Sequence, residues 1–190
     1  MSDGRWEGFD VLGQLPALRR YARSLAGDEA DAEDLVHDAL VRAYERRRTF
    51  RPGGNLRAWL LSVLHNAFAS SRRSRRAELA RVAGATELAD PRIGPSQDGA
   101  VRLVELMQAF RALPEEQRAA LHLVAVEGLS YQEAALALGI PVGTLMSRLS
   151  RARTALRAAE RTGHSARSRP PDGRGGCLRV VEGDGRGTPR

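Results

Sequence analysis

Apolar residues recur every three or four positions through most of this chain, a spacing that belongs to α-helices rather than to β-strands. One stripe consists of Leu15, Leu18, Ala22 and Leu25, the next of Ala32, Leu35, Ala39 and Ala43, and a third of Leu56, Leu60, Val63, Leu64 and Ala67. Aromatic residues make up only 5% of the chain, so Leu, Val and Ala must fill its core, a set that suits small helical domains. The pattern therefore predicts an all-α fold.

Glycine, proline and capping residues divide these stripes into separate helices. Gly27 ends the first helix, and the second begins near Asp31. A loop at 49–54 follows, and Asn55 is a good N-cap for the third helix. That third helix ends in a run of arginines at 72–76.

A change of composition separates these helices from a second group. Residues 77–99 contain several Gly and Pro residues, which predicts a flexible linker with a helical start at 77–82. From Gly163 onward the chain is rich in Gly, Pro, Ser and Arg, which predicts a disordered tail. We therefore expect a first module at 10–76, a linker at 77–99, a second module at 100–162 and a tail at 163–190.

The second module opens with two further helical segments. The first has an apolar stripe of Leu103, Leu106, Met107 and Phe110. The next starts at Pro114, which suits the first turn of a helix, and Gly128 closes it. Its inward-facing residues are predicted to be Leu121, Val124 and Ala125.

A helix-turn-helix is the clearest motif in the second module. Ser130 and Glu133 stand in capping-box spacing, Gly139 permits a left-handed turn, and Pro141 can begin the next helix. Such a helix fits the major groove of DNA, although an ordinary hairpin with a solvated basic face is the simpler alternative. The side chains expected to contact DNA are Thr144, Met146, Ser147, Arg148, Arg151 and Arg153.

Charge favours a nucleic-acid partner, and the residue types argue against catalysis. The net charge is +7, and all 30 basic residues are Arg, so polyanions attract the chain. The single cysteine, Cys177, excludes a disulfide framework and a Cys-rich zinc site, and the four histidines are scattered. We predict no catalytic residues, no cofactor and no metal. The chain lacks a signal segment and a membrane-length apolar run, so we expect a cytoplasmic protein without membrane insertion.

Two polar faces of the first module invite binding hypotheses. Asp34, Asp38 and Arg42 follow one another at i, i+4 spacing, with Asp31 and Glu33 beside them. This face is either a solvated surface with a local ion pair or a docking face for another protein.

On the third helix, Ser62, Asn66, Ser70 and Arg73 form a polar file that suits a phosphate backbone. Trp59 and Phe68 could stack on unpaired bases, but core packing is the favoured role for Trp59.

Several stretches, in order, resemble bacterial sigma factors. Residues 31–44 (DAEDLVHDALVRAY) resemble region 2.2 of that family, and residues 50–60 (FRPGGNLRAWL) with His65-Asn66 resemble regions 2.3 and 2.4. Three further stretches resemble region 4: residues 113–118 (LPEEQR), 128–133 (GLSYQE) and 139–153 (GIPVGTLMSRLSRAR). The likeness covers about 12–76 and 100–160 with no domain between them, as in the extracytoplasmic-function group of sigma-70-type factors.

The resemblance implies both a fold and a function. The first module would be a sigma-2-like bundle of three or four helices, and the second a sigma-4-like four-helix domain with a helix-turn-helix. Together they would bind core RNA polymerase and direct promoter-specific initiation of transcription. The helix from Val142 would read the −35 element as duplex, and the linker would thread toward the RNA exit path. An anti-sigma factor that grips both modules is also expected from the family.

The resemblance also distributes roles over the first module. The acidic helix at 31–48 would hold the coiled coil of the polymerase β′ subunit, and the second module would reach the β flap. The residues expected to bind polymerase are Asp31, Glu33, Asp34, Asp38 and Arg42. A base flipped from the −10 element would be captured near the loop at 49–55. The expected −10 contacts are Arg51, Asn55, Asn66, Ser70, Arg72, Arg73, Arg75 and Arg76.

One departure and two alternatives stand beside this interpretation. Met146 lies where relatives often carry a basic residue, which removes one phosphate contact. The chain could instead be a sigma-like decoy for an anti-sigma factor, although its arginine runs at 72–76 and 148–153 have no use in a decoy. It could also be a dimeric repressor, in which the first module has no obvious use.

Overall fold

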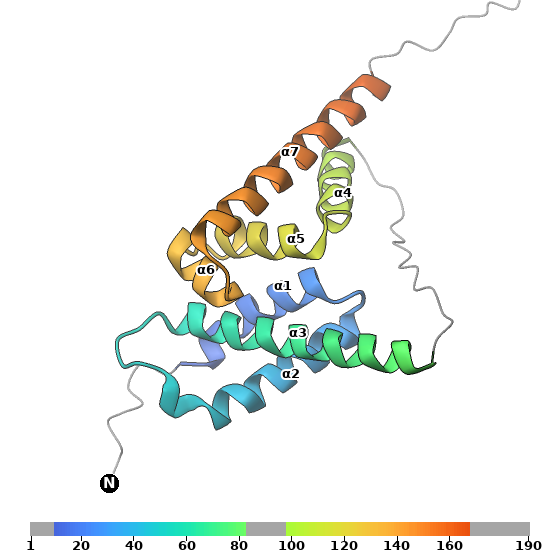
Figure 1. The fold of residues 1–190 in the computed structure, drawn as a ribbon. Helices are drawn as coiled ribbons and strands as arrows, with labels where there is room; N and C mark the ends of the chain where they lie inside the picture. The colour runs from blue at the N-terminus through green and yellow to red at the C-terminus, as the bar shows by residue number, and fades with distance from the viewer. Residues whose placement is uncertain (1–9, 83–97, 168–190) are drawn as a thin grey trace, which may run out of the picture.

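The computed structural model describes residues 10–82 and 98–167, and within these ranges the chain is all-helical, which confirms the predicted fold class (Figure 1). The first module contains α1 (Leu15–Leu25), α2 (Glu29–Glu45) and α3 (Leu56–Val82), with short 3₁₀ turns η2 (Leu12–Gln14) and η3 (Arg47–Thr49). The second module contains α4 (Asp98–Arg111), α5 (Glu115–Leu121), the π-helical turn η4 (His122–Val126), α6 (Tyr131–Leu138) and α7 (Val142–Arg167).

Local capping explains where the helices of the first module begin. The Asp28 carboxylate accepts the backbone N–H of Asp31 at 2.7 Å, so α2 starts at Glu29, slightly earlier than predicted. The Asn55 side-chain oxygen accepts the backbone N–H of Ala58 at 3.1 Å, which confirms the predicted cap of α3. α3 then continues through the arginine run to Val82, so the predicted helical start of the linker belongs to this helix.

The outer boundaries of the two modules differ slightly from expectation. α7 continues to Arg167, beyond Gly163, where the sequence predicts the tail to begin. Most of the expected linker, 83–97, and the rest of the expected tail, 168–190, lie outside the described residues.

The predicted apolar stripes of the first module are buried, apart from Leu15, which is half-buried. Trp59 is half-buried against Phe50, with their ring centroids 5.5 Å apart, which agrees with its favoured packing role. Phe68 is buried as well, so it offers no open ring for stacking on a base in this arrangement.

Two expectations for the second module were wrong. Ala125 is exposed and Val124 only half-buried, because η4 is a π-turn in which the Glu127 N–H donates to the His122 carbonyl at 3.1 Å. The extra residue rotates Leu123 into the core instead. On α4, Leu103, Leu106 and Met107 are exposed rather than buried. α4 packs mainly against α7, and these three side chains remain open to solvent.

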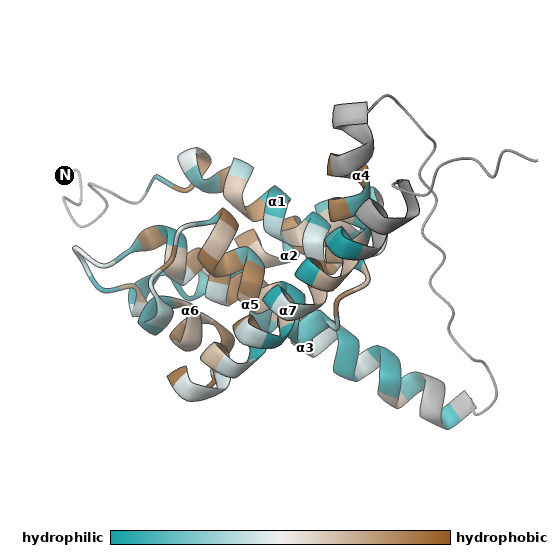
Figure 2. Cartoon of the chain, turned by 90° about the horizontal axis from the view of Figure 1, so that it is seen from above, coloured by the Kyte–Doolittle hydropathy of each residue, from teal (hydrophilic) through white to brown (hydrophobic). Residues whose placement is uncertain are grey.

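The two modules share one continuous apolar core. α6 packs on α3 and α5 packs on α1, so the second module sits directly on the first (Figure 1). Seen from above, apolar residues gather where the helices meet, whereas the far end of α3 projects outward and is mostly hydrophilic (Figure 2). Tyr21 and Leu61, both fully buried, lie in this common core. The fold is thus two modules in direct contact.

Candidate nucleic-acid interface

The helix-turn-helix has the turn chemistry that the sequence predicts. Ser130 Oγ accepts the Glu133 N–H at 3.2 Å, and the Glu133 carboxylate accepts the Ser130 N–H at 2.9 Å, which completes a capping box. Gly139 has a φ of 64°, a left-handed conformation that favours glycine, and it ends α6. Buried Leu145 and Leu149 fix α7 against the module, so its other faces are held in a defined orientation.

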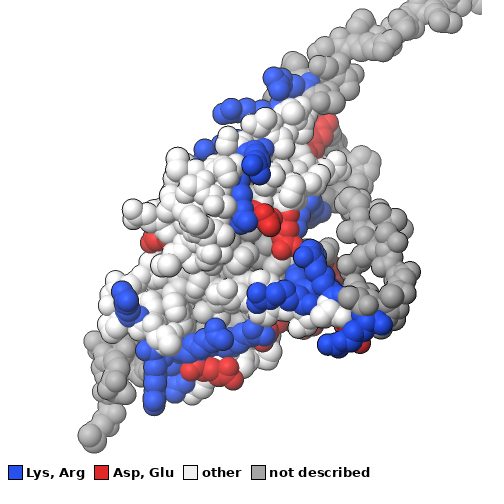
Figure 3. Space-filling model, viewed as in Figure 1, with Lys and Arg blue, Asp and Glu red and all other residues white. Residues whose placement is uncertain are grey.

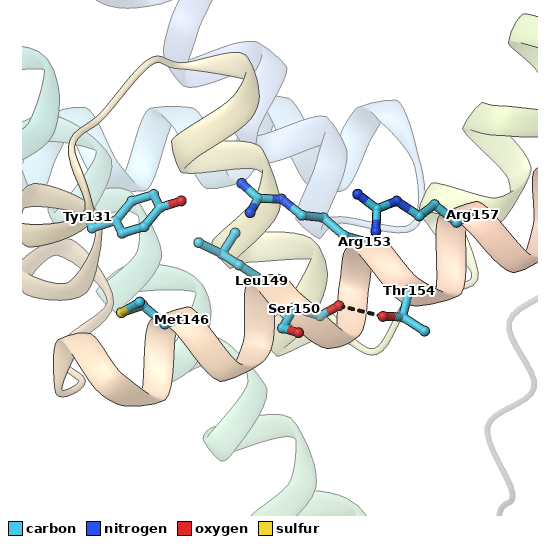
Figure 4. A pocket seen from close by; sticks show the side chains of 7 residues that line it. All are labelled: Tyr131, Met146, Leu149, Ser150, Arg153, Thr154 and Arg157. Carbon is cyan, nitrogen blue, oxygen red and sulfur yellow. Dashed lines mark hydrogen bonds between the residues drawn. The ribbon is translucent and has the colours of Figure 1, made fainter.

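One flank of α7 carries an open, arginine-lined pocket (Figure 4). Met146 and Arg153, both predicted DNA contacts, line it together with Tyr131, Ser150 and Arg157. Figure 4 shows Arg153 and Arg157 reaching from the same side of α7. The prediction missed Ser150 and Arg157, although their positions continue the helical spacing that starts at Met146 and could have identified them.

Arg148 lies on the opposite flank and faces the first module. Its guanidinium is 2.9 Å from the Glu116 carboxylate, and only 21% of its side chain is exposed. The pKa of His65 on α3 is lowered to about 4, mainly by burial of its ring and further by the positive charge of Arg148. Ser147 and Arg151 are exposed, and Thr144 is half-buried. The predicted −35 residues are therefore spread over two flanks of α7, and one flank is partly covered.

The basic end of α3 is open to solvent. Asn66, Arg73, Arg75 and Arg76 are exposed. Arg73 donates a hydrogen bond to Ser70 Oγ at 3.2 Å. Arg51, in the loop before α3, is exposed too. Figure 3 shows basic side chains gathered near this end of the molecule. These side chains are available to a phosphate backbone.

Two of the predicted −10 contacts are held by the second module. The Asn55 amide donates to the Glu133 carboxylate at 2.7 Å, and Arg72 lies 3.3 Å from the Glu115 carboxylate. Hydrogen bonds from Ser130 and then from Asn55 lower the pKa of Glu133. In Figure 3 an acidic patch on the upper module lies directly above basic side chains of the lower one. Carboxylates thus occupy side chains for which DNA phosphates would compete.

The acidic face of α2 divides into exposed residues and residues held in ion pairs. Asp31 and Asp34 are exposed, whereas Glu33 pairs with Arg19 at 3.1 Å and Asp38 with Arg42 at 2.9 Å. The three aspartates, Asp31, Asp34 and Asp38, line one wall of a groove whose other wall carries Arg72 and Arg75 from α3.

The exposed stripe of α2 also contains large apolar side chains. Val41 is 45% exposed and Tyr44 is 65% exposed, and both follow Asp34 at helical spacing. The prediction missed them because it considered only charged residues. Exposed apolar residues beside acids are typical of a protein-binding surface.

The structure offers no site for catalysis by a metal ion within residues 10–82 and 98–167. No group of three or more metal-ligating side chains occurs in these ranges. None of the helices described combines the length and apolar character needed to cross a bilayer.

Known proteins resemble both modules. Residues 13–78 match the family model described as Sigma-70 region 2, and residues 103–156 match Sigma-70, region 4. The chain is 41% identical over 149 residues to the ECF RNA polymerase sigma factor EcfG of Rhodopseudomonas palustris, covering 78% of this chain and 82% of the relative.

Two solved complexes have a similar fold. The first, the sigma factor RpoE with the anti-sigma factor NepR from Bartonella quintana, is 37% identical with a TM-score of 0.71, covering 82% of this chain and 96% of the other. The second, CnrH with the cytosolic domain of CnrY, is 30% identical with a TM-score of 0.57, covering 85% and 91%.

Proposed function

Because this chain belongs to the extracytoplasmic-function group of sigma-70-type RNA polymerase sigma factors, we propose that α2 docks it on polymerase while α3 and α7 hold promoter DNA. A sigma factor binds core RNA polymerase and directs promoter-specific initiation, so the chain is a transcription regulator rather than an enzyme. The proposal assigns a role in that process to each exposed helix face.

α7 reads the −35 element as duplex DNA. Its N-terminal turns enter the major groove, where Ser147 and Arg151 reach base edges or phosphates. The open flank lined by Met146 and Arg153 extends the contact surface, with Ser150 and Arg157 added by the geometry. Thr144 and Arg148 complete the surface on the other flank, once Arg148 is free of its present contacts.

α3 and the loop before it hold the melted −10 element. Arg73, Arg75 and Arg76 bind phosphates from the exposed end of the helix, supported by Ser70 and Arg72. Flipping a base out of the stack costs a few kcal/mol, on the order of one stacking step, so a receiving pocket is needed. Arg51, Asn55 and Asn66 supply the polar groups for that pocket.

α2 contacts the polymerase β′ coiled coil through its exposed stripe. Asp31 and Asp34 supply charge, and Val41 and Tyr44 supply apolar area. Glu33 acts indirectly, because its ion pair with Arg19 ties α2 to α1. Asp38 and Arg42 pair within α2 and stabilise the helix itself. The second module reaches the β flap, and residues 83–97 pass toward the RNA exit path.

An anti-sigma factor is a further proposed partner. Two similar proteins were solved as complexes. The one with 37% identity is bound to NepR, which is named as an anti-sigma factor, and the one with 30% identity is bound to CnrY.

The chain acts in the cytoplasm, where core polymerase is found. The observation that carries these roles is the pairing, in one chain, of a capped helix-turn-helix with an exposed basic helix.

Transcription in vitro tests the function. Purified chain with core polymerase and genomic promoter fragments is expected to yield promoter-specific transcripts, whose start sites define the −35 and −10 sequences. A decoy or a repressor would yield none, and that result would overturn the proposal.

A docking variant tests the role of α2. Asp31→Arg with Asp34→Arg reverses two exposed charges and is expected to abolish co-purification with core polymerase while leaving the circular dichroism spectrum unchanged. Glu160→Arg, an exposed reversal on α7, is the control and should co-purify normally. Normal binding by the double variant would contradict the docking role.

A further inference from the structure

Met146 is a large apolar side chain that stands on the surface of the helix-turn-helix. It lies one turn into α7 and is 52% exposed. Leu145 beside it and Leu149 one turn later are both buried, so they anchor the helix to the module without its help. Figure 4 shows Met146 at the N-terminal end of the pocket, away from Arg153 and Arg157. Packing of the core therefore does not account for this side chain.

Three of the residues that surround Met146 on the helix surface are short. Gly143 lies one turn before it, Ser147 directly after it and Ser150 one turn later, and all three are exposed. A Cβ atom added at Gly143 would meet nothing within 4 Å beyond its own helical turn, in the part of the chain that the structure describes. Val142, which is 38% exposed, extends the apolar surface. Met146 thus projects beyond its short neighbours on an open face of the helix.

The thioether limits what Met146 can recognise in DNA. It carries no charge and is a weak hydrogen-bond acceptor, so it has little to offer a phosphate. The base edges in the major groove present hydrogen-bonding groups and one apolar group, the C5 methyl of thymine. A methionine side chain is flexible and polarisable, which suits an apolar contact of this kind. Thymine is therefore the base whose edge matches Met146.

We propose that Met146 selects a thymine of the −35 element by packing against its C5 methyl group. This rests on the proposed function, in which α7 enters the major groove, and it adds the base that this position reads. A basic side chain here would hold a phosphate whatever the sequence, whereas methionine gains affinity where the methyl group is present. The chain thus has a base-specific contact in place of one that ignores sequence.

Replacing thymine by uracil tests this contact. Uracil lacks the C5 methyl group but keeps the hydrogen-bonding groups of thymine. Holoenzyme formed with the full-length chain is titrated with labelled duplexes of a promoter mapped in the transcription assay. In each duplex one thymine of the −35 element, on either strand, is replaced by uracil. At the thymine that Met146 contacts, we expect binding to weaken by about fourfold, the factor that corresponds to exposing one buried methyl group.

Two variants of Met146 separate an apolar contact from side-chain length. Met146→Gln keeps the length but is polar, and Met146→Ala is short, so both should bind the thymine and uracil duplexes equally at that position. Met107→Ala is the matched control, because it removes the same type of side chain from α4, where it is 41% exposed. This control should keep the full uracil effect. Circular dichroism verifies that each variant is folded.

The ratio of the two dissociation constants, uracil duplex over thymine duplex, is compared for each variant. This ratio is unaffected by a general loss of affinity or by incomplete holoenzyme assembly. A ratio that stays the same in wild type and Met146→Ala at every thymine would overturn the contact. So would a Met146→Gln variant as sensitive to uracil as the wild type, or a mapped −35 element without thymine on either strand.

The two proposals fail in different ways. If the holoenzyme directs no promoter-specific transcription, the sigma-factor roles fail. If it does so, but uracil at each position of the −35 element leaves binding unchanged, only the reading of thymine by Met146 fails.

Discussion

The two DNA-binding helices are unequally available. On α3, Arg75 and Arg76 are exposed at the end that projects from the molecule. On α7, Arg148 is only 21% exposed and is bonded to Glu116. The sequence predicts DNA contacts for all three arginines, yet their surroundings differ. The availability of each arginine thus depends on its neighbours, which for Arg148 include Glu116 of its own module, and not on the motif that carries it.

The difference has an electrostatic pattern. Where the modules meet, the second module contributes carboxylates and the first contributes the donors that bind them. Glu115 meets Arg72, Glu127 meets Arg20 and Glu133 meets Asn55. The carboxylates of the second module thereby occupy donors of the first. DNA phosphates must displace some of these carboxylates to bind the same donors.

Matched core truncations should give the largest effects. Leu64→Ala in the first module and Leu145→Ala in the second each remove a fully buried side chain and should cost about 2–5 kcal/mol of unfolding free energy. Because the modules share a core, Leu145→Ala should also shift the tryptophan fluorescence midpoint, although Trp6 and Trp59 both precede α4.

Urea unfolding followed by fluorescence and circular dichroism measures this coupling. Leu136→Ala, at a side chain 82% exposed, is the control and should shift the midpoint by less than about 0.5 kcal/mol. An unchanged fluorescence midpoint for Leu145→Ala would mean that the modules unfold independently.

Arginine substitutions come next and distinguish the two DNA surfaces. In the holoenzyme, Arg148→Ala should weaken binding to the −35 duplex by about 1–3 kcal/mol if it contacts a base. Arg73→Ala should instead weaken binding to all sequences similarly and reduce the salt slope by about 1. Titrations at several salt concentrations measure both. Arg161→Ala, exposed far along α7, is the control, and an Arg148→Ala variant that matches it would remove Arg148 from the reading surface.

Helix caps provide a smaller and directly matched comparison. Asp28→Ala removes one capping bond from α2, whereas Ser130→Ala removes a reciprocal box from α6. Each should cost about 0.5–2 kcal/mol, with Ser130→Ala the more costly, because it also loosens the Glu133 carboxylate. Thermal unfolding gives the two values, and a larger loss for Asp28→Ala would reverse the ranking.

Acid acts on a single partly buried side chain. The pKa of His65 is lowered to about 4 from 6.5, so between these pH values the folded chain binds fewer protons than the unfolded chain. The contribution of His65 to stability is therefore fully present above pH 6.5 and is lost as the pH falls toward 4. The charge of Arg148 adds to this lowering, so NMR titration of Arg148→Ala should give a higher His65 pKa. An unchanged value would mean that Arg148 does not act on His65.

Local rules account for what the sequence predicts well. The helices, the Asn55 cap and the capping box at Ser130 depend on residues within a few positions of one another. Contacts between the modules do not. Arg20 and Glu127 are 107 positions apart, so Glu127 reads in the sequence as an ordinary surface acid. Nor does regular helical periodicity allow for η4, which explains the misplaced Ala125.

The π-turn η4 also sets how this chain tolerates insertions and deletions. Deleting one residue between His122 and Val126 would restore ordinary helical winding and rotate the segment after the turn by about 100°. Glu127 would leave its place between Arg20 and Arg57, and the buried residues that follow it, Leu129 and Leu138 among them, would turn away from the shared core. The one extra residue in this turn therefore fixes how all the later helices meet the first module.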